Sequence, residues 1–153
     1  MWKTEFEKML PYMGHRNWIL IVDKAFPLQT AAGMTFLDSE RPMEEVVEYV
    51  WQQIAAAPHL RPVVYLDRES RYLDDTLCPG AEALFTAIGA VTKPDAGNLI
   101  WHDEIFRKMD EASKLFATVV IKTSCTIPYS SVFIELDCGY WDAEREKRLR
   151  ERI

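Results

Sequence analysis

The chain has 153 residues, of which 48% are hydrophobic and 27% charged, with a formal net charge of −6. This length fits one domain with a sizeable core, and the acidic balance argues against a nucleic-acid partner, which normally requires a basic face. No apolar run approaches the roughly 20 residues of a transmembrane helix, and the mixed charges at the start do not resemble a signal peptide, so we expect a cytoplasmic protein that does not enter a membrane. Three scattered cysteines predict reduced thiols, with no disulfide framework and no metal site.

The first half of the chain alternates between helical and extended patterns. Apolar residues at helical spacing predict a short helix over residues 3–13, and the continuous apolar run 18–22 is typical of a strand buried on both faces. Residues 42–57 combine the i, i+3, i+4 spacing with acidic residues in the first turn, which predicts a helix. A second buried strand is expected at 62–66 and another helix at 80–90.

The second half continues this alternation and ends in a charged segment. We expect a short strand at 98–101, a helix at 102–116, and strands at 116–122 and 131–136. Residues 142–153 have the composition of a charged helix, which extends the domain at its C-terminus. The order of these elements predicts a single α/β domain over the whole chain, with three layers in which helices flank a mainly parallel or mixed central sheet.

Two segments far apart in the sequence carry the candidate chemistry. His15 and Asp23 stand on either side of the first buried apolar run, and the segment 128–131, with Tyr129, opens the last one. An imidazole, a carboxylate and a phenol around one polar pocket suit proton transfer on a small hydroxylated ligand. No glycine-rich phosphate loop and no nucleophile elbow is present, which argues against phosphoryl transfer and serine hydrolysis.

These motifs resemble those of the D-ribose pyranase and L-fucose mutarotase (RbsD/FucU) family. Gly14-His15 is followed by Asp23 eight residues after the histidine and by Pro27 four residues later, and a Pro-Tyr pair ending in Tyr129 precedes an apolar strand. The resemblance covers most of the chain and is nearer to the fucose branch, from which the chain diverges at several positions. It implies the three-layer fold of that family.

The resemblance also implies a function. Members of the family are cofactor-independent isomerases that interconvert the cyclic forms of a monosaccharide such as L-fucose or D-ribose, by opening and reclosing its ring. This reaction needs a base at the anomeric hydroxyl and an acid at the ring oxygen. His15 is implied as the proton-transfer group, because an imidazole has a pKa of about 6.5, and Asp23 and Tyr129 are implied as its catalytic partners. A ring-like homo-oligomer, such as a decamer, with sites near the subunit interfaces is implied as well.

Three positions depart from the family pattern. Asn17 stands where many members have an acidic residue, Ser131 where an asparagine is usual, and Cys125 where a glutamate is common. We take Asn17 and Ser131 as candidate substrate-binding residues. His102 is a third candidate, because it resembles a second histidine of the ribose branch, although its sequence position predicts a place about one helical turn too far from Tyr129.

Other interpretations of these residues stay open. Asp23 suits a turn before Pro27, Tyr129 suits a core aromatic position, His102 suits the start of a helix, and a histidine beside a strand, as at His15, is commonly structural. The departures also favour a second hypothesis, a non-catalytic monosaccharide-binding or regulatory protein on the same fold. A purely structural, oligomer-forming protein is a third hypothesis. It does not explain why a His, an Asp and a Tyr stand at positions that match the family motifs.

Overall fold

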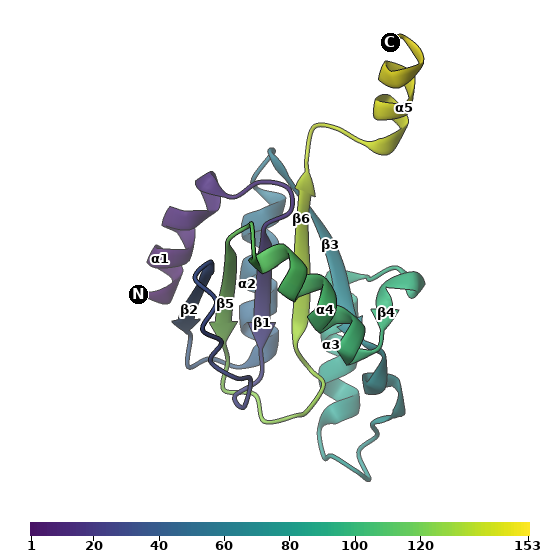
Figure 1. Ribbon diagram of the computed structural model, residues 1–153. Helices are drawn as coiled ribbons and strands as arrows, with labels where there is room; N and C mark the ends of the chain where they lie inside the picture. The colour runs from purple at the N-terminus through teal and green to yellow at the C-terminus, as the bar shows by residue number, and fades with distance from the viewer.

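A six-stranded mixed sheet runs through the middle of the computed structural model, which describes residues 1–153 (Figure 1). The strand order is β2-β5-β1-β6-β3-β4. Strand β6 is antiparallel to both of its neighbours, and every other pair of strands is parallel. The carboxyl ends of five strands therefore meet the start of β6 at one edge of the sheet, which we call the carboxyl edge. The strands are β1 (Trp18–Val22), β2 (Met34–Asp38), β3 (Leu60–Asp67), β4 (Leu99–Ile100), β5 (Thr118–Lys122) and β6 (Val132–Cys138).

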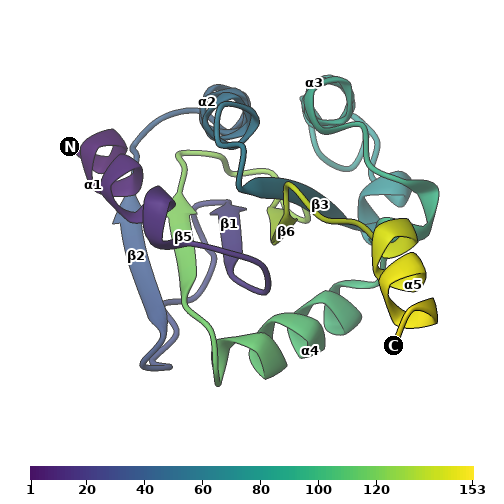
Figure 2. The same ribbon diagram turned by 90° about the horizontal axis from the view of Figure 1, so that it is seen from above.

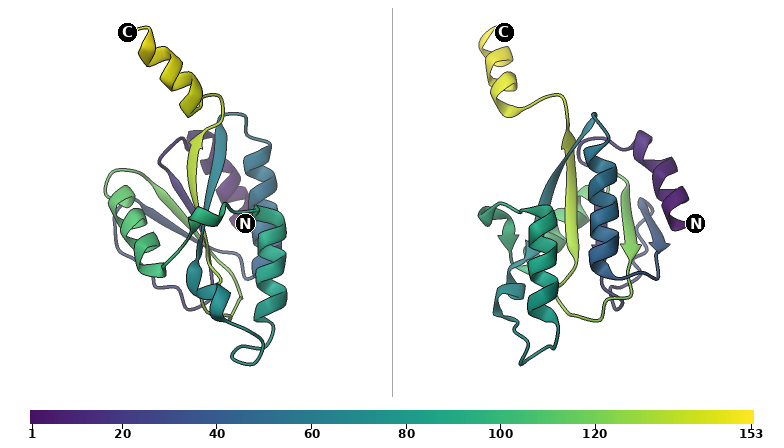
Figure 3. Two further views of the ribbon diagram at one scale, coloured as in Figure 1. Left: turned by 90° about the vertical axis from the view of Figure 1, so that its right-hand side faces the viewer. Right: turned by 180° about the vertical axis from the view of Figure 1, so that it is seen from behind.

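Helices cover both faces of the sheet. One face carries α1 (Trp2–Met9), α2 (Met43–Ala55) and α3 (Ala81–Thr92), and the other carries α4 (His102–Ser113) (Figure 2). The last helix, α5 (Ala143–Glu151), buries no residue and projects away from the end of β6 (Figure 3). None of these helices combines the length and apolarity that a membrane crossing requires.

Two hydrophobic clusters form the core, one on each face of the sheet. The larger packs the sheet against α1, α2 and α3, and includes Ile19 and Ile21 of β1. The smaller lies under α4 and includes Trp18, Leu20 and Val22 of the same strand. Successive side chains of a strand point to opposite faces, so both faces of β1 are buried, which explains its uninterrupted apolar sequence.

The predicted α/β class, with three layers and a mixed central sheet, is confirmed. One strand, β2, was not predicted from the sequence. It lies at the edge of the sheet, and of its five side chains only that of Leu37 is buried. A half-exposed edge strand lacks the continuous apolar run that marks β1, so its sequence does not stand out from a loop.

Candidate functional site

Five polar or aromatic residues converge at the carboxyl edge of the sheet. They come from four places in the sequence, because the antiparallel β6 brings its starting residues to the ends of β1 and β3. We call this group the carboxyl-edge cluster. It consists of Asp23 after β1, Asp67 at the end of β3, His102 at the start of α4, and Tyr129 and Ser131 before β6.

The side chain of Ser131 fixes the carboxylate of Asp23. Its hydroxyl group donates a hydrogen bond to Oδ1 of Asp23 over 3.0 Å and accepts one from the backbone N–H of Asp23 over 3.3 Å. Ser131 is only 4% exposed, so this pair is protected from competing water. The second carboxylate oxygen of Asp23 is left to accept a hydrogen bond from a ligand.

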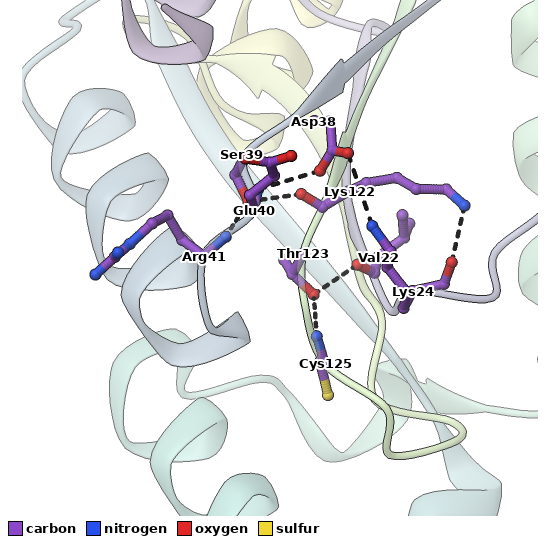
Figure 4. A network of polar contacts seen from close by, with 9 residues as sticks. All are labelled: Val22, Lys24, Asp38, Ser39, Glu40, Arg41, Lys122, Thr123 and Cys125. Carbon is purple, nitrogen blue, oxygen red and sulfur yellow. Dashed lines mark hydrogen bonds and ion pairs between the residues drawn. The ribbon is translucent and has the colours of Figure 1, made fainter.

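The loop that carries this aspartate is tied to the neighbouring strand β5 (Figure 4). The hydroxyl group of Thr123 donates to the carbonyl oxygen of Val22 over 2.8 Å, and the ammonium group of Lys122 donates to that of Lys24 over 2.9 Å. Both residues that flank Asp23 are therefore fixed through their backbone. Side chains held in this way lose little conformational freedom when they meet a ligand.

His102 forms a hydrogen-bonded pair with a buried carboxylate. Its Nδ1 lies 2.8 Å from Oδ1 of Asp67, whose side chain is 1% exposed. Burial raises the pKa of Asp67, and the hydrogen bond to that carboxylate raises the pKa of His102. The backbone N–H of His102 also donates to the carboxylate of Glu69, which caps the start of α4. Nε2 remains as the second ring nitrogen, available for proton exchange with a ligand.

Aromatic rings surround the His102 imidazole. The ring of Phe106 lies 4.5 Å away between centroids, and that of Tyr129 meets it edge-on at 5.7 Å. Tyr129 has a φ of 56°, a left-handed conformation that costs a non-glycine residue on the order of 1–3 kcal/mol. This backbone turn directs the ring toward His102. The side chain is 42% exposed, so its phenol hydroxyl is open to a ligand.

His15 and Asn17 lie at the opposite edge of the sheet. The five residues of β1 separate them from Asp23, a distance of about 17 Å for an extended strand. His15 is exposed, whereas the amide of Asn17 closes a turn, accepting from the backbone N–H of Gly14 over 2.7 Å and donating to the carbonyl of Ala117 over 3.0 Å. The single pocket predicted around His15, Asp23 and Tyr129 is therefore not formed within one chain.

Comparison with known proteins adds evidence on the fold. No protein-family model and no curated protein sequence matches the chain. Among solved structures, Bacillus subtilis RbsD complexed with D-ribose matches with a TM-score of 0.60 at 14% identity, over 88% of this chain and 92% of that one. FucU from Bifidobacterium longum matches with a TM-score of 0.58 at 14% identity, over 88% and 94% of the two chains. The fucose mutarotase of Streptococcus pneumoniae in complex with L-fucose matches with a TM-score of 0.52 at 11% identity, over 87% and 91%.

The chain has the RbsD/FucU fold. The resemblance stated from its two sequence motifs is thereby confirmed at the level of the fold. The low identities fit a divergent sequence, as the departures at Asn17, Cys125 and Ser131 predict.

Within this RbsD/FucU fold, two residues differ from what the sequence indicated. His102 was expected about one helical turn too far from Tyr129, but the two rings are in contact, because β4 pairs with the end of β3 and so brings the start of α4 to the carboxyl edge. Asp67 was not identified at all. Its signal was its place at the end of a buried strand, the same position that drew attention to Asp23.

Cysteines and metal-ligand groups take no visible part in the site. Cys78, Cys125 and Cys138 are free thiols. No three His, Cys, Asp or Glu side chains lie close enough together to hold a metal ion. The groups that the carboxyl-edge cluster offers to a ligand include the carboxylate of Asp23, the phenol of Tyr129 and the imidazole of His102.

Proposed function

We propose that the protein is a cofactor-independent monosaccharide isomerase of the mutarotase or pyranase type, which acts at the carboxyl-edge cluster. The observation that carries this proposal is the His102–Asp67 pair, 2.8 Å apart, with Tyr129 in contact with its imidazole. A titratable ring held by a buried carboxylate beside a free phenol provides the groups that proton transfer on a sugar requires. Further support comes from the fold, which the chain shares with an RbsD bound to D-ribose and a fucose mutarotase bound to L-fucose.

The reaction proceeds by ring opening and closure. A base removes the proton of the anomeric hydroxyl, the bond between the anomeric carbon and the ring oxygen breaks, and an acid protonates that oxygen. Rotation of the resulting aldehyde and attack by a hydroxyl on its other face give the second cyclic form, with the acid and base roles exchanged. In the proposed site Nε2 of His102 and the Tyr129 hydroxyl exchange these protons, while Asp23, oriented by Ser131, accepts a hydrogen bond from a sugar hydroxyl.

We further propose that His15 acts in the cluster of a second copy of the chain, within a homo-oligomer such as a ring of ten subunits. His15 is exposed at the edge of the sheet opposite to the cluster, so it can face a neighbouring subunit but not its own Asp23. Asn17 shapes the turn that carries His15, and its proposed contact with the sugar is made from that same edge. Two imidazoles, one from each subunit, would then flank the sugar.

A non-catalytic sugar-binding protein is the second candidate. This candidate is favoured because two polar side chains already form hydrogen bonds within the chain. The amide of Asn17 bonds to the backbone, and the hydroxyl of Ser131 bonds to Asp23. These are two of the positions that depart from the family pattern. A protein of this kind would bind a monosaccharide without accelerating its exchange.

Saturation-transfer NMR separates the two candidates. L-fucose, D-ribose and other common aldoses are tested with the wild type and with the variants His102→Ala and His59→Gln, the latter as a control on a histidine distant from the cluster. We expect the wild type and the control to exchange cyclic forms faster than the spontaneous background, and His102→Ala to be slower by roughly 10²–10⁴-fold. Binding without acceleration would establish the sugar-binding protein, and neither binding nor acceleration would overturn both candidates.

A further inference from the structure

A pocket of about 420 Å³ adjoins the carboxyl-edge cluster on the side of α3. Its walls come from α3, from the short helix η2 (Arg68–Tyr72) and from the segment before β6. Tyr129 and Ser131 belong both to this pocket and to the cluster. The volume falls in the range of small-molecule sites, roughly 300–1,000 Å³. A ligand in the pocket therefore contacts two residues of the proposed catalytic site.

The charges around this pocket differ from those of the protein as a whole. The chain carries 24 acidic and 18 basic residues, but none of the 13 residues that line the pocket is acidic and two are basic, Arg71 and Lys93. Neither of these two takes part in any ion pair of the structure, whereas several other exposed arginines and lysines do. Two unpaired cations that share one pocket in an acidic protein create a local attraction for an anion.

Lys93 occupies this position at a cost to its backbone. It ends α3 in a left-handed conformation, with a φ of 42°, which helix ends usually assign to glycine. A lysine at such a position is strained, and strain of this kind concentrates at functional sites. Thr86, a further residue with a hydroxyl group, also lines the pocket. Guanidinium, ammonium and hydroxyl groups together match the oxygens of a phosphate or carboxylate.

We infer that this pocket binds an anionic group of the ligand, and that the substrate class is a monosaccharide that carries a phosphate or a carboxylate. The inference rests on the proposed function, because it places one sugar across both the pocket and the cluster, in contact with Tyr129. Arg71 holds the anion in a bidentate manner, Lys93 neutralises its remaining charge, and the five apolar residues of the lining contact the carbon skeleton.

The test compares charged and neutral sugars of the same skeleton. Binding is measured by calorimetry, and exchange by NMR, for D-glucose, D-glucose 6-phosphate and D-glucuronate, and for D-ribose and D-ribose 5-phosphate. We expect at least one anionic sugar to bind about tenfold or more tightly than its neutral parent, and this preference to weaken as salt is added. The phosphate and carboxylate members of the glucose series show which anion the pocket takes.

Three variants connect this preference to the pocket. Arg71→Gln and Lys93→Gln each remove one charge from its lining, and we expect each to lower the affinity for the anionic sugar by roughly 10- to 100-fold. Lys147→Gln removes one charge from α5, outside the pocket, and serves as the matched control with unchanged affinity. Equal affinities for charged and neutral sugars, or an anion preference that survives both pocket variants, would overturn the inference.

The outcomes also separate this inference from the proposed function. Accelerated exchange of neutral sugars, without any preference for anionic ones, would leave the isomerase in place and remove the anion pocket. Anion-dependent binding that is lost in Arg71→Gln and Lys93→Gln, without accelerated exchange of any sugar, would keep the pocket and remove the isomerase.

Discussion

The hydrogen bond between Asp67 and His102 lowers the pKa of the carboxyl group and raises the pKa of the imidazole. Burial is the largest influence on Asp67 and raises its pKa, although the hydrogen bond with His102 lowers it. The same hydrogen bond is the largest influence on His102 and raises the pKa of its imidazole above the ordinary value of 6.5, against burial, which lowers it. His102 therefore stabilises the folded chain fully below about pH 6.5, and this contribution is lost as the pH rises through its folded-state pKa.

The variant Asp67→Asn tests this coupling. It keeps the size of the side chain and removes its charge, so the hydrogen bond to a carboxylate and its Coulomb attraction are both lost while burial of His102 remains. We expect the pKa of His102 to fall below its wild-type value, as measured by NMR titration of the imidazole. Glu69→Gln is the comparison, because Glu69 contributes a weaker attraction, and its effect should be smaller. A pKa of His102 that is unchanged in Asp67→Asn would contradict the pairing.

Sequence reasoning identified four of the five residues in the cluster. Asp23, Tyr129 and Ser131 were identified because their positions belong to motifs with a characteristic spacing, and His102 because it resembles a second histidine of the ribose branch. Asp67 was missed, since its partner lies 35 positions away and only the pairing of β3 with β4 brings the two together. Its place at the end of a buried strand was a signal, but unlike Asp23 it had no sequence motif to support it.

At the scale of whole elements, the close approach between the end of β6 and the start of β3, which pair in the sheet, depends on one glycine. Gly139 follows β6, and its N–H donates to the carbonyl of His59 over 3.1 Å. A Cβ atom at this position would meet the carbonyl oxygen of Pro58 and lie 2.8 Å from the backbone nitrogen of Leu60. Backbone atoms cannot turn aside as a flexible side chain can, so the two segments must separate to admit a methyl group.

We therefore expect Gly139→Ala to destabilise the fold by roughly 1–3 kcal/mol, which lowers the Tm by several degrees in a chain of this size. Thermal unfolding followed by circular dichroism measures the change. Gly97→Ala is the matched control, because a Cβ atom at Gly97 meets nothing within 4 Å. Equal Tm values for the two variants would show that the end of β6 and the start of β3 pack less tightly than the structure indicates.

Helices and strands could be predicted from the sequence where burial gives them a recognisable apolar pattern. The run of β1 and the middle of β5 (residues 119–121) are apolar because helices cover both faces of the sheet, and α2 shows its buried face as a regular spacing. Strand β2 gave no such signal because one of its sides lacks a neighbouring strand. The first helix ended earlier than expected, at Met9, where the three-residue helix η1 (Leu10–Tyr12), which contains Pro11, takes over.

For the whole molecule, the two ends of β1 present chemistry to opposite edges of the sheet. One end leads to Asp23 and the other begins after His15, so a site that combines them needs two chains. Sequence spacing alone suggested a single pocket, because the seven residues between His15 and Asp23 form a short segment in sequence but a long one when they are extended as a strand. In the proposed homo-oligomer, the two ends of β1 in one chain take part in two different sites.

Mixed oligomers test this arrangement. A chain with His15→Ala and a chain with His102→Ala are each expected to be inactive, whereas unfolding and refolding them together should restore activity at about one quarter of the sites. That fraction follows because each site needs one intact residue from each of two neighbours. Exchange rates by NMR, with the oligomeric state measured by light scattering, provide the readout. If mixed oligomers show no restored activity, either both histidines act in the site of one chain or one of them does not act in the reaction.

The position of β1 at the centre of the sheet also governs how the chain folds. Its two neighbours, β5 and β6, come after the other strands of the sheet in the chain, and the contact between Asp23 and Ser131 spans 108 positions. While the ribosome is still making the middle of the chain, the five apolar side chains of β1 have no partners and require protection from aggregation. Closure of so many distant contacts is slow. The sheet and the candidate site are consequently expected to form together, once β6 has been synthesised.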